Sequence, residues 1–448
     1  MEYTQRIAEL LRRPTPRLEP AELESFVSAF LHRRDEFLSL IQRHGSPVYV
    51  LDKSALISRA REFISVFGAV SPRNGFFYAV KSNNCPQVAA ILVGEGFGLD
   101  VSSGLELQMA LECGAEAIIF SGPGKTEAEL ELGVKHSEFV TILLDSFGEL
   151  ERLRAVTGRH GTPVRAGVRL STVESGIWRK FGIPLERLAE FLDAAERCSQ
   201  VRLCGVQFHL SWNMDPDKQV MFIKRLGTAL RNLPSERRRQ IEFIDIGGGY
   251  WPGVGEWLQA AATPEGMLRN ALQLEPGSPL EHFKNQAAPL GDFADRLGTA
   301  LREHLPTDVS CEIYCEPGRW LCHDAMHILL TVADCKAPDL VITDGGTNAV
   351  GWERFESDHF PVINLTRPAL VEHECLVAGS LCTPHDLWGY TYFGDDIQPG
   401  DVLLVPSQGA YTYSLRQEFI KPVPPVVILG GDADAGPDGK GPTISGSE

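Results

Sequence analysis

Residues 76–84 read FFYAVKSNN, a short apolar run of strand type that ends at Lys81. Seven similar runs follow along the chain, at residues 97–101, 117–120, 140–144, 164–170, 203–208, 243–246 and 312–315. Segments with helical spacing of apolar residues, such as 105–113 and 185–195, lie between them. Strands that are apolar throughout are buried on both faces, as in a parallel sheet, and eight of them close a (β/α)8 barrel. The sequence therefore predicts an α/β protein with a TIM-like barrel, and an open doubly wound sheet is the alternative.

The rest of the chain has a different pattern on each side of this barrel. We expect four parts in chain order: a helical extension over 1–46, the barrel over 47–320 with an insertion near 250–310, a C-terminal β domain over 321–429, and a disordered tail over 430–448. The extension has apolar residues at helical spacing and is expected to pack on the β domain. Strand-like runs predict the β domain, at 328–332, 340–343, 361–365, 375–378, 401–405 and 425–429. The tail is rich in Gly, Asp and Ser and has little to bury.

The charge balance disfavours several classes of partner. The 448 residues contain 42 Lys+Arg against 59 Asp+Glu, a net charge of −17. Such a field repels phosphate backbones and anionic lipids, so neither nucleic acid nor a membrane is an expected partner. The N-terminus has no basic segment followed by an apolar run and a cleavage site, so we expect a cytoplasmic protein.

No metal site is predicted. The ten cysteines include no C-x-x-C pair, which argues against a disulfide framework and against a zinc ribbon. His323 and His327 are four residues apart, but no Glu follows His323 and the segment leads into a strand. We interpret both as structural histidines and the cysteines as reduced thiols.

The reactive side chains of a parallel barrel stand where its strands end. Lys81 directly follows a predicted buried strand, and desolvation there is expected to lower its pKa and to suit it to bonding with an aldehyde. Gly247, Gly248 and Gly249 follow another strand and would let backbone N–H groups approach a phosphate. A solvent-facing lysine and a plain tight turn are the alternatives.

Two further strand ends complete this set. His209 could provide a flat ring or be a core histidine, and Glu316 could face a ligand or be paired with Arg319. An amine, a phosphate cradle, a ring support and a carboxylate are together what pyridoxal phosphate requires, because its pyridine nitrogen must stay protonated. The sequence therefore predicts pyridoxal 5'-phosphate as the cofactor.

A series of short motifs makes a resemblance specific. In chain order the motifs are YAVKSN at 78–83, His209, IGGG at 246–249, EPGR at 316–319, GSLC at 379–382 and GAY at 409–411. This series resembles that of the fold-type III pyridoxal phosphate-dependent decarboxylases, the diaminopimelate, ornithine and arginine decarboxylase family. The resemblance implies the alanine racemase-like arrangement of a barrel followed by a β domain. It also implies a homodimer with active sites shared at the subunit interface.

The resemblance assigns roles by matching position. Lys81 would bind the cofactor's aldehyde, His209 would stack on the ring, and Glu316 would pair with the pyridine nitrogen. Cys382 would reach the partner subunit's cofactor and protonate the substrate α-carbon after carbon dioxide leaves. The other cofactor-binding residues would be Asp100, Gly247, Gly248, Gly249, Gly318, Arg319 and Tyr411, with supporting positions at Glu106, Arg169 and Lys180.

The region that would recognise the substrate departs from the family. Thr383 follows Cys382 where the family usually has Asp or Glu, which recognises the far amine of a basic substrate. An unpaired buried ammonium would cost several kcal/mol, so ornithine, lysine and diaminopimelate are not expected substrates. Asp386 could replace the missing carboxylate if its loop turns inward. Arg354 is the nearest candidate for a substrate carboxylate, and Arg179 could serve an acidic substrate or be a solvated loop residue.

We therefore expect a pyridoxal phosphate-dependent amino-acid decarboxylase, a carboxy-lyase with a small-molecule substrate. A racemase or epimerase is the first alternative, although it would ordinarily pair Lys81 with a tyrosine from the β domain. A non-catalytic homologue that binds a protein partner is the second alternative. The retention of Lys81, Glu316, Arg319, Cys382 and Tyr411 argues against it.

Overall fold

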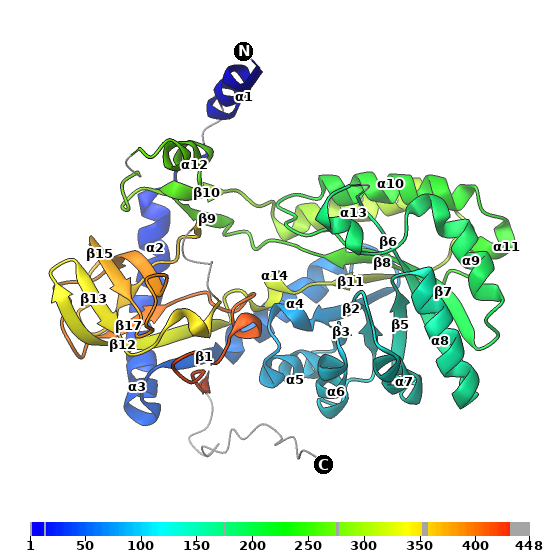
Figure 1. Cartoon of the computed structure of the whole chain (residues 1–448), viewed down its shortest axis with the longest axis horizontal. Coiled ribbons are helices and arrows are strands. Elements are labelled where there is room, and N and C mark those ends of the chain that lie inside the picture. The colour runs from blue at the N-terminus through cyan, green and yellow to red at the C-terminus, as the bar shows by residue number, and fades with distance from the viewer. Residues whose placement is uncertain (1, 13–14, 174, 275–276, 352–356, 431–448) are drawn as a thin grey trace.

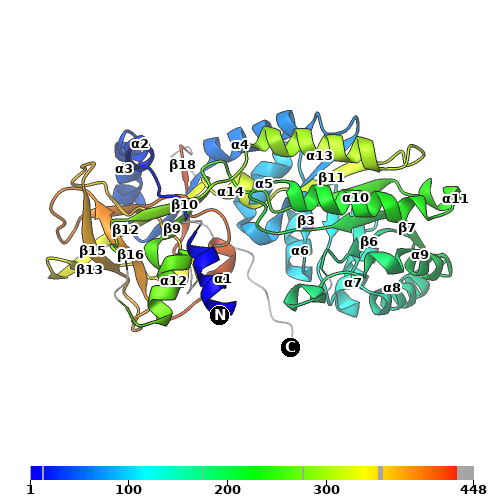
Figure 2. The ribbon, with the colours of Figure 1, turned by 90° about the horizontal axis from the view of Figure 1, so that it is seen from above.

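Two lobes lie side by side in the structure, a barrel and a β domain (Figure 1, Figure 2). The structure is a computed structural model, and it describes residues 2–12, 15–173, 175–274, 277–351 and 357–430. The tail predicted to be disordered lies outside the described residues from 431 onward, and so does Arg354.

Eight parallel strands close the barrel that the sequence predicts. In chain order they are β2 (Asn74–Ala79), β3 (Gly98–Val101), β4 (Ile118–Phe120), β5 (Val140–Leu144), β6 (Val164–Leu170), β7 (Val201–Phe208), β8 (Phe243–Gly248) and β11 (Glu312–Glu316). Each strand pairs with the next, and β11 closes the ring by pairing with both β8 and β2. Every predicted barrel run is a strand, so the barrel is confirmed and the open sheet is wrong.

Helices cover the outside of the barrel (Figure 2). They are α4 (Lys53–Phe67), α5 (Pro86–Gly94), α6 (Gly104–Glu112), α7 (Glu127–Lys135), α8 (Phe147–His160), α9 (Leu188–Glu196), α10 (Asp217–Arg231), the short α11 (Ser235–Arg238) and α13 (Leu290–His304). Ser103, Thr126 and Ser146 cap α6, α7 and α8 by accepting a backbone N–H. These caps fix where each helix begins and keep the loops after the strands short.

Aromatic rings fill the end of the barrel at which its strands begin. Phe243 stacks on Tyr314 with 4.8 Å between ring centroids, and the Arg165 guanidinium lies 5.0 Å from the Phe243 centroid. A Cβ on Gly205 would lie 2.1 Å from the Phe243 ring, so this glycine makes room for it. The rings close the end at which the strands begin, and the functional site forms at the other end.

The second lobe is built on an eight-stranded sheet of order β13-β15-β16-β14-β17-β12-β1-β18. Its strands are β1 (Val48–Asp52), β12 (Met326–Ala337), β13 (Leu340–Thr343), β14 (Ile363–Asn364), β15 (Glu372–Ala378), β16 (Leu387–Phe393), β17 (Val402–Val405) and β18 (Val426–Leu429). Six of these overlap the predicted strand runs of the β domain. The strand β16 was not predicted, and β1 was expected to belong to the barrel.

The strand β1 corrects the barrel boundary predicted at residue 47. It pairs antiparallel with β12 and parallel with β18, so it belongs to the sheet of the β domain. Val48 and Val50 join one hydrophobic cluster, and Tyr49 and Leu51 join the other, as expected for alternating sides of a strand. A strand that is buried on both faces fits either a barrel or a sheet, so its apolar sequence does not identify its partner.

The N-terminal extension forms α1 (Glu2–Leu11), α2 (Pro20–Leu31) and α3 (Arg34–His44). Val27 of α2 and Phe37 of α3 are fully buried in one cluster with Leu329 and Leu404 of the sheet. The helices α2 and α3 therefore pack on the β domain, and both views show them beside it (Figure 1, Figure 2).

The insertion begins after β8. It contains an antiparallel pair, β9 (Glu256–Gln259) and β10 (His282–Asn285), with α12 (Pro264–Ala271) between the two strands. Phe26 of α2 meets the Trp257 ring edge-on at 4.9 Å, which ties the insertion to the extension. The helix α13, within the range predicted for the insertion, packs on α10 and is a helix of the barrel.

None of the described helices combines the length and the apolar character needed to cross a bilayer. All ten cysteines are free thiols.

Candidate active site

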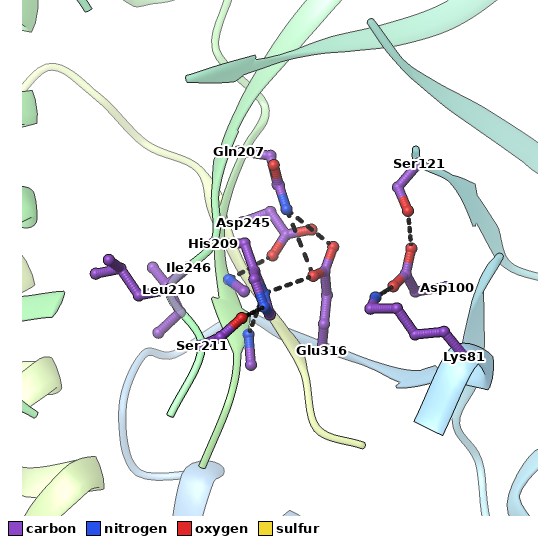
Figure 3. Close-up of polar contacts among 12 residues, drawn as sticks. Lys81, Asp100, Ser121, Gln207, His209, Leu210, Ser211, Asp245, Ile246 and Glu316 are labelled. Atoms are coloured by element: carbon purple, nitrogen blue, oxygen red, sulfur yellow. Dashed lines mark hydrogen bonds and ion pairs between the residues drawn. The ribbon is translucent and has the colours of Figure 1, made fainter. Parts of the chain in front are cut away.

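Lys81 and its partners come from three consecutive strand ends. Lys81 lies in the turn that follows β2, Asp100 lies in β3, and Ser121 follows β4. Lys81 Nζ is 2.7 Å from Asp100 Oδ2, and Ser121 Oγ donates to Asp100 Oδ1 at 2.5 Å (Figure 3). Asp100 is fully buried, so its carboxylate is held between an ammonium and a hydroxyl rather than by water.

Electrostatics within this cluster correct the pKa direction expected for Lys81. Burial opposes its charge, but Asp100 and Glu316 outweigh burial and raise the pKa of Lys81 above its ordinary value. The sequence-based expectation of a lowered pKa considered desolvation without these two acids. Burial and the charge of Glu316 raise the pKa of Asp100 to about 6, although Lys81 opposes that shift. Lys81 is therefore held as an ammonium ion.

His209 follows β7 and is held as a neutral ring. The N–H of Gly248 donates to His209 Nδ1 at 3.2 Å, so Nδ1 bears a lone pair and the ring proton is on Nε2, 3.3 Å from Ser211 Oγ. Burial lowers the pKa of His209, in agreement with a neutral imidazole. Glu316 Oε2 is 3.6 Å from His209 Nδ1 and takes no proton from it in this arrangement.

Glu316 ends β11 and lies at the centre of the site (Figure 3). Gln207 Nε2 lies 3.3 and 3.4 Å from its two carboxylate oxygens. Glu316 forms no ion pair with Arg319, both being described residues, although that pair was one sequence-based possibility. Burial alone would raise the pKa of Glu316, but hydrogen bonding within the cluster and the charge of Lys81 bring it down to about 2. Glu316 therefore carries a negative charge inside the barrel.

Two N–H groups of the glycine run already have partners within the protein. The N–H of Gly247 donates to Asp245 Oδ1 at 2.8 Å, and that of Gly248 is taken by His209. A phosphate contact through this run would therefore come from Gly249. A Cβ on Gly248 would lie 1.9 Å from the Glu316 carbonyl oxygen, so the backbone approaches β11 closely only without a side chain.

Arg319 begins the short helix α14 (Arg319–Cys322) and is half-buried against aromatic rings. Its guanidinium lies 4.1 Å from the Trp251 ring centroid and 5.0 Å from that of Tyr411. Within the described ranges no carboxylate forms an ion pair with it, and burial lowers its pKa. Asp358 and Glu256 act on the guanidinium only through their charge. A half-buried guanidinium without a direct carboxylate contact in the described structure fits an anionic ligand such as a phosphate.

Gly318 and Tyr411 lie against the turn that carries Lys81. A Cβ on Gly318 would be 2.9 Å from Ser82 Oγ, and the N–H of Tyr411 donates to the Ser82 carbonyl at 2.7 Å. These contacts join the Arg319 region to the Lys81 turn. The Lys81 amine and the Arg319 guanidinium therefore belong to one site.

The three supporting positions differ in their surroundings. Glu106 accepts the N–H of Ser102 at 2.7 Å, and burial raises its pKa. Arg169 and Lys180 both lie over the Phe181 ring, at 4.5 and 4.9 Å from its centroid. Glu106 thus fixes the loop after β3, and the two cations line the loop after β6.

In the described structure, no hydrogen bond or ion pair of Lys81, Asp100 or Glu316 involves a residue expected to bind substrate. Cys382 is exposed on the β domain, in the loop after β15, and Thr383 is half-buried beside it. Arg179 is exposed. Asp386 is buried, and its role is corrected: Oδ1 accepts the N–H and the hydroxyl of Thr347 at 2.7 and 2.9 Å.

The other oxygen of Asp386 is also engaged. Oδ2 accepts the N–H of Leu381 at 2.6 Å. With both oxygens bonded to the backbone and to Thr347, Asp386 braces its own loop and does not turn a carboxylate toward a substrate.

Sequence reasoning missed Gln207 and Asp245 as parts of the site. Both lie within runs that were interpreted as apolar strands, and both are buried in the structure. A polar residue inside an otherwise apolar strand was the available signal, because such a residue must point at a partner or a ligand.

Possible metal ligands gather at one place in the described ranges, formed by His282, His359 and Glu372. The two imidazole rings stack with 3.6 Å between centroids and 13° between planes. In-plane lone pairs of parallel rings do not converge on one ion, so this arrangement adds no metal centre to the site. His327 packs between Phe30 and Phe37, which is a structural environment.

Comparison with known proteins identifies the family. The family model of the pyridoxal-dependent decarboxylase, pyridoxal binding domain, matches residues 53–323. The chain belongs to this family. The decarboxylase fold, the lyase class and the pyridoxal phosphate cofactor expected from the sequence are thereby confirmed.

Relatives of this decarboxylase match over most of its length. It is 25% identical to the diaminopimelate decarboxylase of Aquifex aeolicus over 428 residues, which cover 92% of this chain and 91% of that one. It is also 25% identical to the L-glutamyl-[BtrI acyl-carrier protein] decarboxylase of Niallia circulans, in an alignment that covers 88% of this chain and 91% of that one. The solved diaminopimelate decarboxylase of M. jannaschii with L-lysine has a TM-score of 0.71 at 22% identity, covering 87% and 88%, and shares the fold.

The site of this decarboxylase fits its cofactor. When bound, pyridoxal phosphate supplies the electron sink for loss of an α-carboxylate. The aldehyde would be bound by Lys81 and the phosphate by Gly249, Gly318, Arg319 and Tyr411. Glu316 would face the pyridine nitrogen with its negative charge, and the neutral His209 would offer a ring face.

Proposed function

We propose that this decarboxylase removes the α-carboxylate of an amino acid whose far end carries no positive charge. The observation that carries the proposal is the engagement of Asp386, whose carboxylate accepts three hydrogen bonds from Thr347 and Leu381. Thr383 adds no charge, so the described loop after Cys382 offers no free carboxylate to an ammonium group. A buried ammonium would stay unpaired there, which disfavours ornithine, lysine and diaminopimelate as substrates.

The relatives span both chemistries. Diaminopimelate decarboxylases act on a substrate with a distal ammonium, whereas the Niallia circulans relative is named for an L-glutamyl group on a carrier protein. The loop of Thr383 and Asp386 favours the second chemistry for this chain. We therefore propose an acidic or uncharged amino acid, either free or attached through its side-chain carboxyl.

We further propose a cytoplasmic homodimer in which Cys382 acts in the partner subunit's site. Support comes from the exposure of Cys382, which sits on the β domain while Lys81 lies in the barrel. An exposed thiol on a loop that is braced by Asp386 is a rigid donor for a neighbouring molecule. There it would deliver a proton to the substrate α-carbon.

Substrate class is tested by carbon dioxide release. The purified holoenzyme is incubated with glutamate, aspartate, uncharged amino acids, ornithine, lysine and diaminopimelate, and with glutamyl groups on a carrier protein. We expect release from the acidic or uncharged class, and none from Lys81→Ala. Release from the basic amino acids alone would contradict the substrate class, and α-proton exchange without release would indicate a racemase.

Hybrid dimers test the shared site. Lys81→Ala and Cys382→Ala are each expected to be inactive alone, since each site lacks one group. After subunit exchange at equal amounts, half of the dimers are mixed, and each mixed dimer has one intact site, so about one quarter of the wild-type activity returns. No recovery, with exchange verified by mass spectrometry, would place Cys382 in the site of its own chain or outside it.

A further inference from the structure

Two side chains on neighbouring strands lie against Glu316. Gln207 of β7 is the cross-strand partner of Asp245 of β8, and both point into the barrel beside Glu316 (Figure 3). None of the three is more than 2% exposed. The site thus contains one neutral amide and two carboxyl groups in a single buried cluster.

The hydrogen bonds of this cluster lack one donor. Asp245 Oδ1 accepts the N–H of Gly247, and Gln207 Nε2 is directed at both oxygens of Glu316. Asp245 Oδ2 and Gln207 Oε1 are buried acceptors for which the described ranges supply no donor. A buried polar atom without a partner costs roughly 1–3 kcal/mol, and a proton on Asp245 would turn one of these two acceptors into a donor.

A proton on Asp245 Oδ2 resolves both the missing hydrogen bond and the charge. As a carboxylic acid, Asp245 gains an O–H donor toward Gln207 or Glu316, and the pair of acids carries one negative charge in place of two. The titratable groups that interact with Asp245 are Glu316, Asp100, Cys315 and Tyr250, and none of them carries a positive charge. Burial, followed by the charge of Glu316, raises the pKa of Asp245 far above its ordinary value.

We propose that Asp245 is a protonated carboxylic acid in the working enzyme and that, together with Gln207, it acts as a positioning residue for Glu316. Asp245 keeps the negative charge on Glu316 alone, and the Gln207 amide fixes both oxygens of that carboxylate. The inference rests on the proposed function only in that Glu316 faces the cofactor. An ionised Asp245 would place a second charge beside Glu316 and drive Glu316 to take up a proton, removing the charge that the ring nitrogen needs.

Infrared difference spectroscopy of the holoenzyme tests the proton directly, without turnover. The wild-type spectrum minus that of Asp245→Asn is expected to contain the carbonyl stretch of a protonated carboxylic acid, present from pH 6 to pH 9. Asp295→Asn, an exposed position on α13, is the matched control and should give no such band. Absence of the band in the wild type would overturn the proposal.

Variants of Gln207 test the positioning. Gln207→Leu is expected to lower kcat by about 10–100-fold with little change in KM, as for a residue that orients a ligand-contacting group from behind. Gln207→Glu adds a second charge and is expected to change the absorbance of the bound cofactor as well. Two results would contradict a positioning role for Gln207. One is a loss of kcat/KM in Gln207→Leu that comes from KM alone, and the other is an unchanged cofactor spectrum in Gln207→Glu.

Two variants of Asp245 separate a positioning role of this residue from a purely structural one. Asp245→Asn retains a donor of similar shape and is expected to keep the cofactor spectrum, whereas Asp245→Leu is expected to lose it. If Asp245→Leu does not fold, the infrared band and the Gln207 variants still decide the question. Because the infrared and absorbance measurements need no substrate, failure of the proposed decarboxylation leaves their outcome readable.

Discussion

The ammonium of Lys81 is 2.7 Å from the carboxylate of Asp100, whose other oxygen accepts the hydroxyl of Ser121. An ammonium held this way cannot attack an aldehyde until it loses a proton, so Asp100 sets the pH at which Lys81 becomes a nucleophile. The strand end places the lysine in the site, and the neighbouring strand determines its charge.

Replacing Asp100 is expected to lower the pH at which the apoprotein captures pyridoxal phosphate. Asp100→Asn removes the carboxylate that raises the pKa of Lys81, so the midpoint of the capture rate against pH should fall by roughly 1–3 units. Stopped-flow absorbance after mixing apoprotein with cofactor measures this midpoint. Asp295→Asn should leave it in place, and an upward shift in Asp100→Asn would contradict the assigned charge.

Gly248→Ala is expected to weaken both the fold and the cofactor site. The new Cβ would lie 1.9 Å from the Glu316 carbonyl oxygen, and backbone cannot swing away as a side chain can. We expect a loss of about 1–3 kcal/mol in the free energy of unfolding, by urea denaturation, together with weaker cofactor binding. Gly253→Ala is the control, because nothing lies within 4 Å of its Cβ position. Equal stability of the two variants would show that β8 and β11 are not so closely packed.

His327 is expected to make the β domain sensitive to acid. Burial lowers its pKa to about 4, so between pH 6.5 and pH 4 the unfolded chain binds a proton that the folded chain does not. This contribution to stability is present above pH 6.5 and is lost as the pH falls, by up to about 3 kcal/mol. Urea unfolding from pH 7 to pH 4.5 should show a shallower decline for His327→Asn than for the wild type. The exposed His44, replaced by Asn, should behave as the wild type does.

Asp386→Asn is expected to loosen the Cys382 loop. An amide has one acceptor oxygen, so one side of the brace to Thr347 and Leu381 is lost, at a cost of about 1.5–3 kcal/mol in unfolding free energy. Hydrogen exchange should rise over residues 379–386. Asp339→Asn, an exposed site next to β13, serves as the control. A loss of activity confined to basic substrates, with the unfolding free energy and the hydrogen exchange unchanged, would indicate that Asp386 faces the substrate.

The barrel was predictable because each of its strands is apolar throughout and is followed by a helical segment. The strand β1 was not assignable, since an apolar strand carries no mark of the sheet it joins. Lys81 and Glu316 could be found because they stand at strand ends, whereas Gln207 and Asp245 are buried inside strands. Their importance depends on which strands are neighbours, and a single strand does not contain that information.

Charge and loop direction were the least predictable features. The pKa of Lys81 depends on Asp100 and Glu316, which are 19 and 235 residues away along the chain. The orientation of Asp386 depends on Thr347, which is 39 residues away. In both cases the sequence supplies the chemical groups, and the folded topology decides which of them meet.

The position of β1 between β12 and β18 has a consequence for biosynthesis. The ribosome delivers β1 first, then the entire barrel, and only then the strand Met326–Ala337 that pairs with it. At roughly 5–20 residues per second, β1 waits on the order of 14–55 s for its partner. During translation the barrel can close while β1 is still an unpaired apolar edge, so this short segment is where a nascent chain would first need a chaperone.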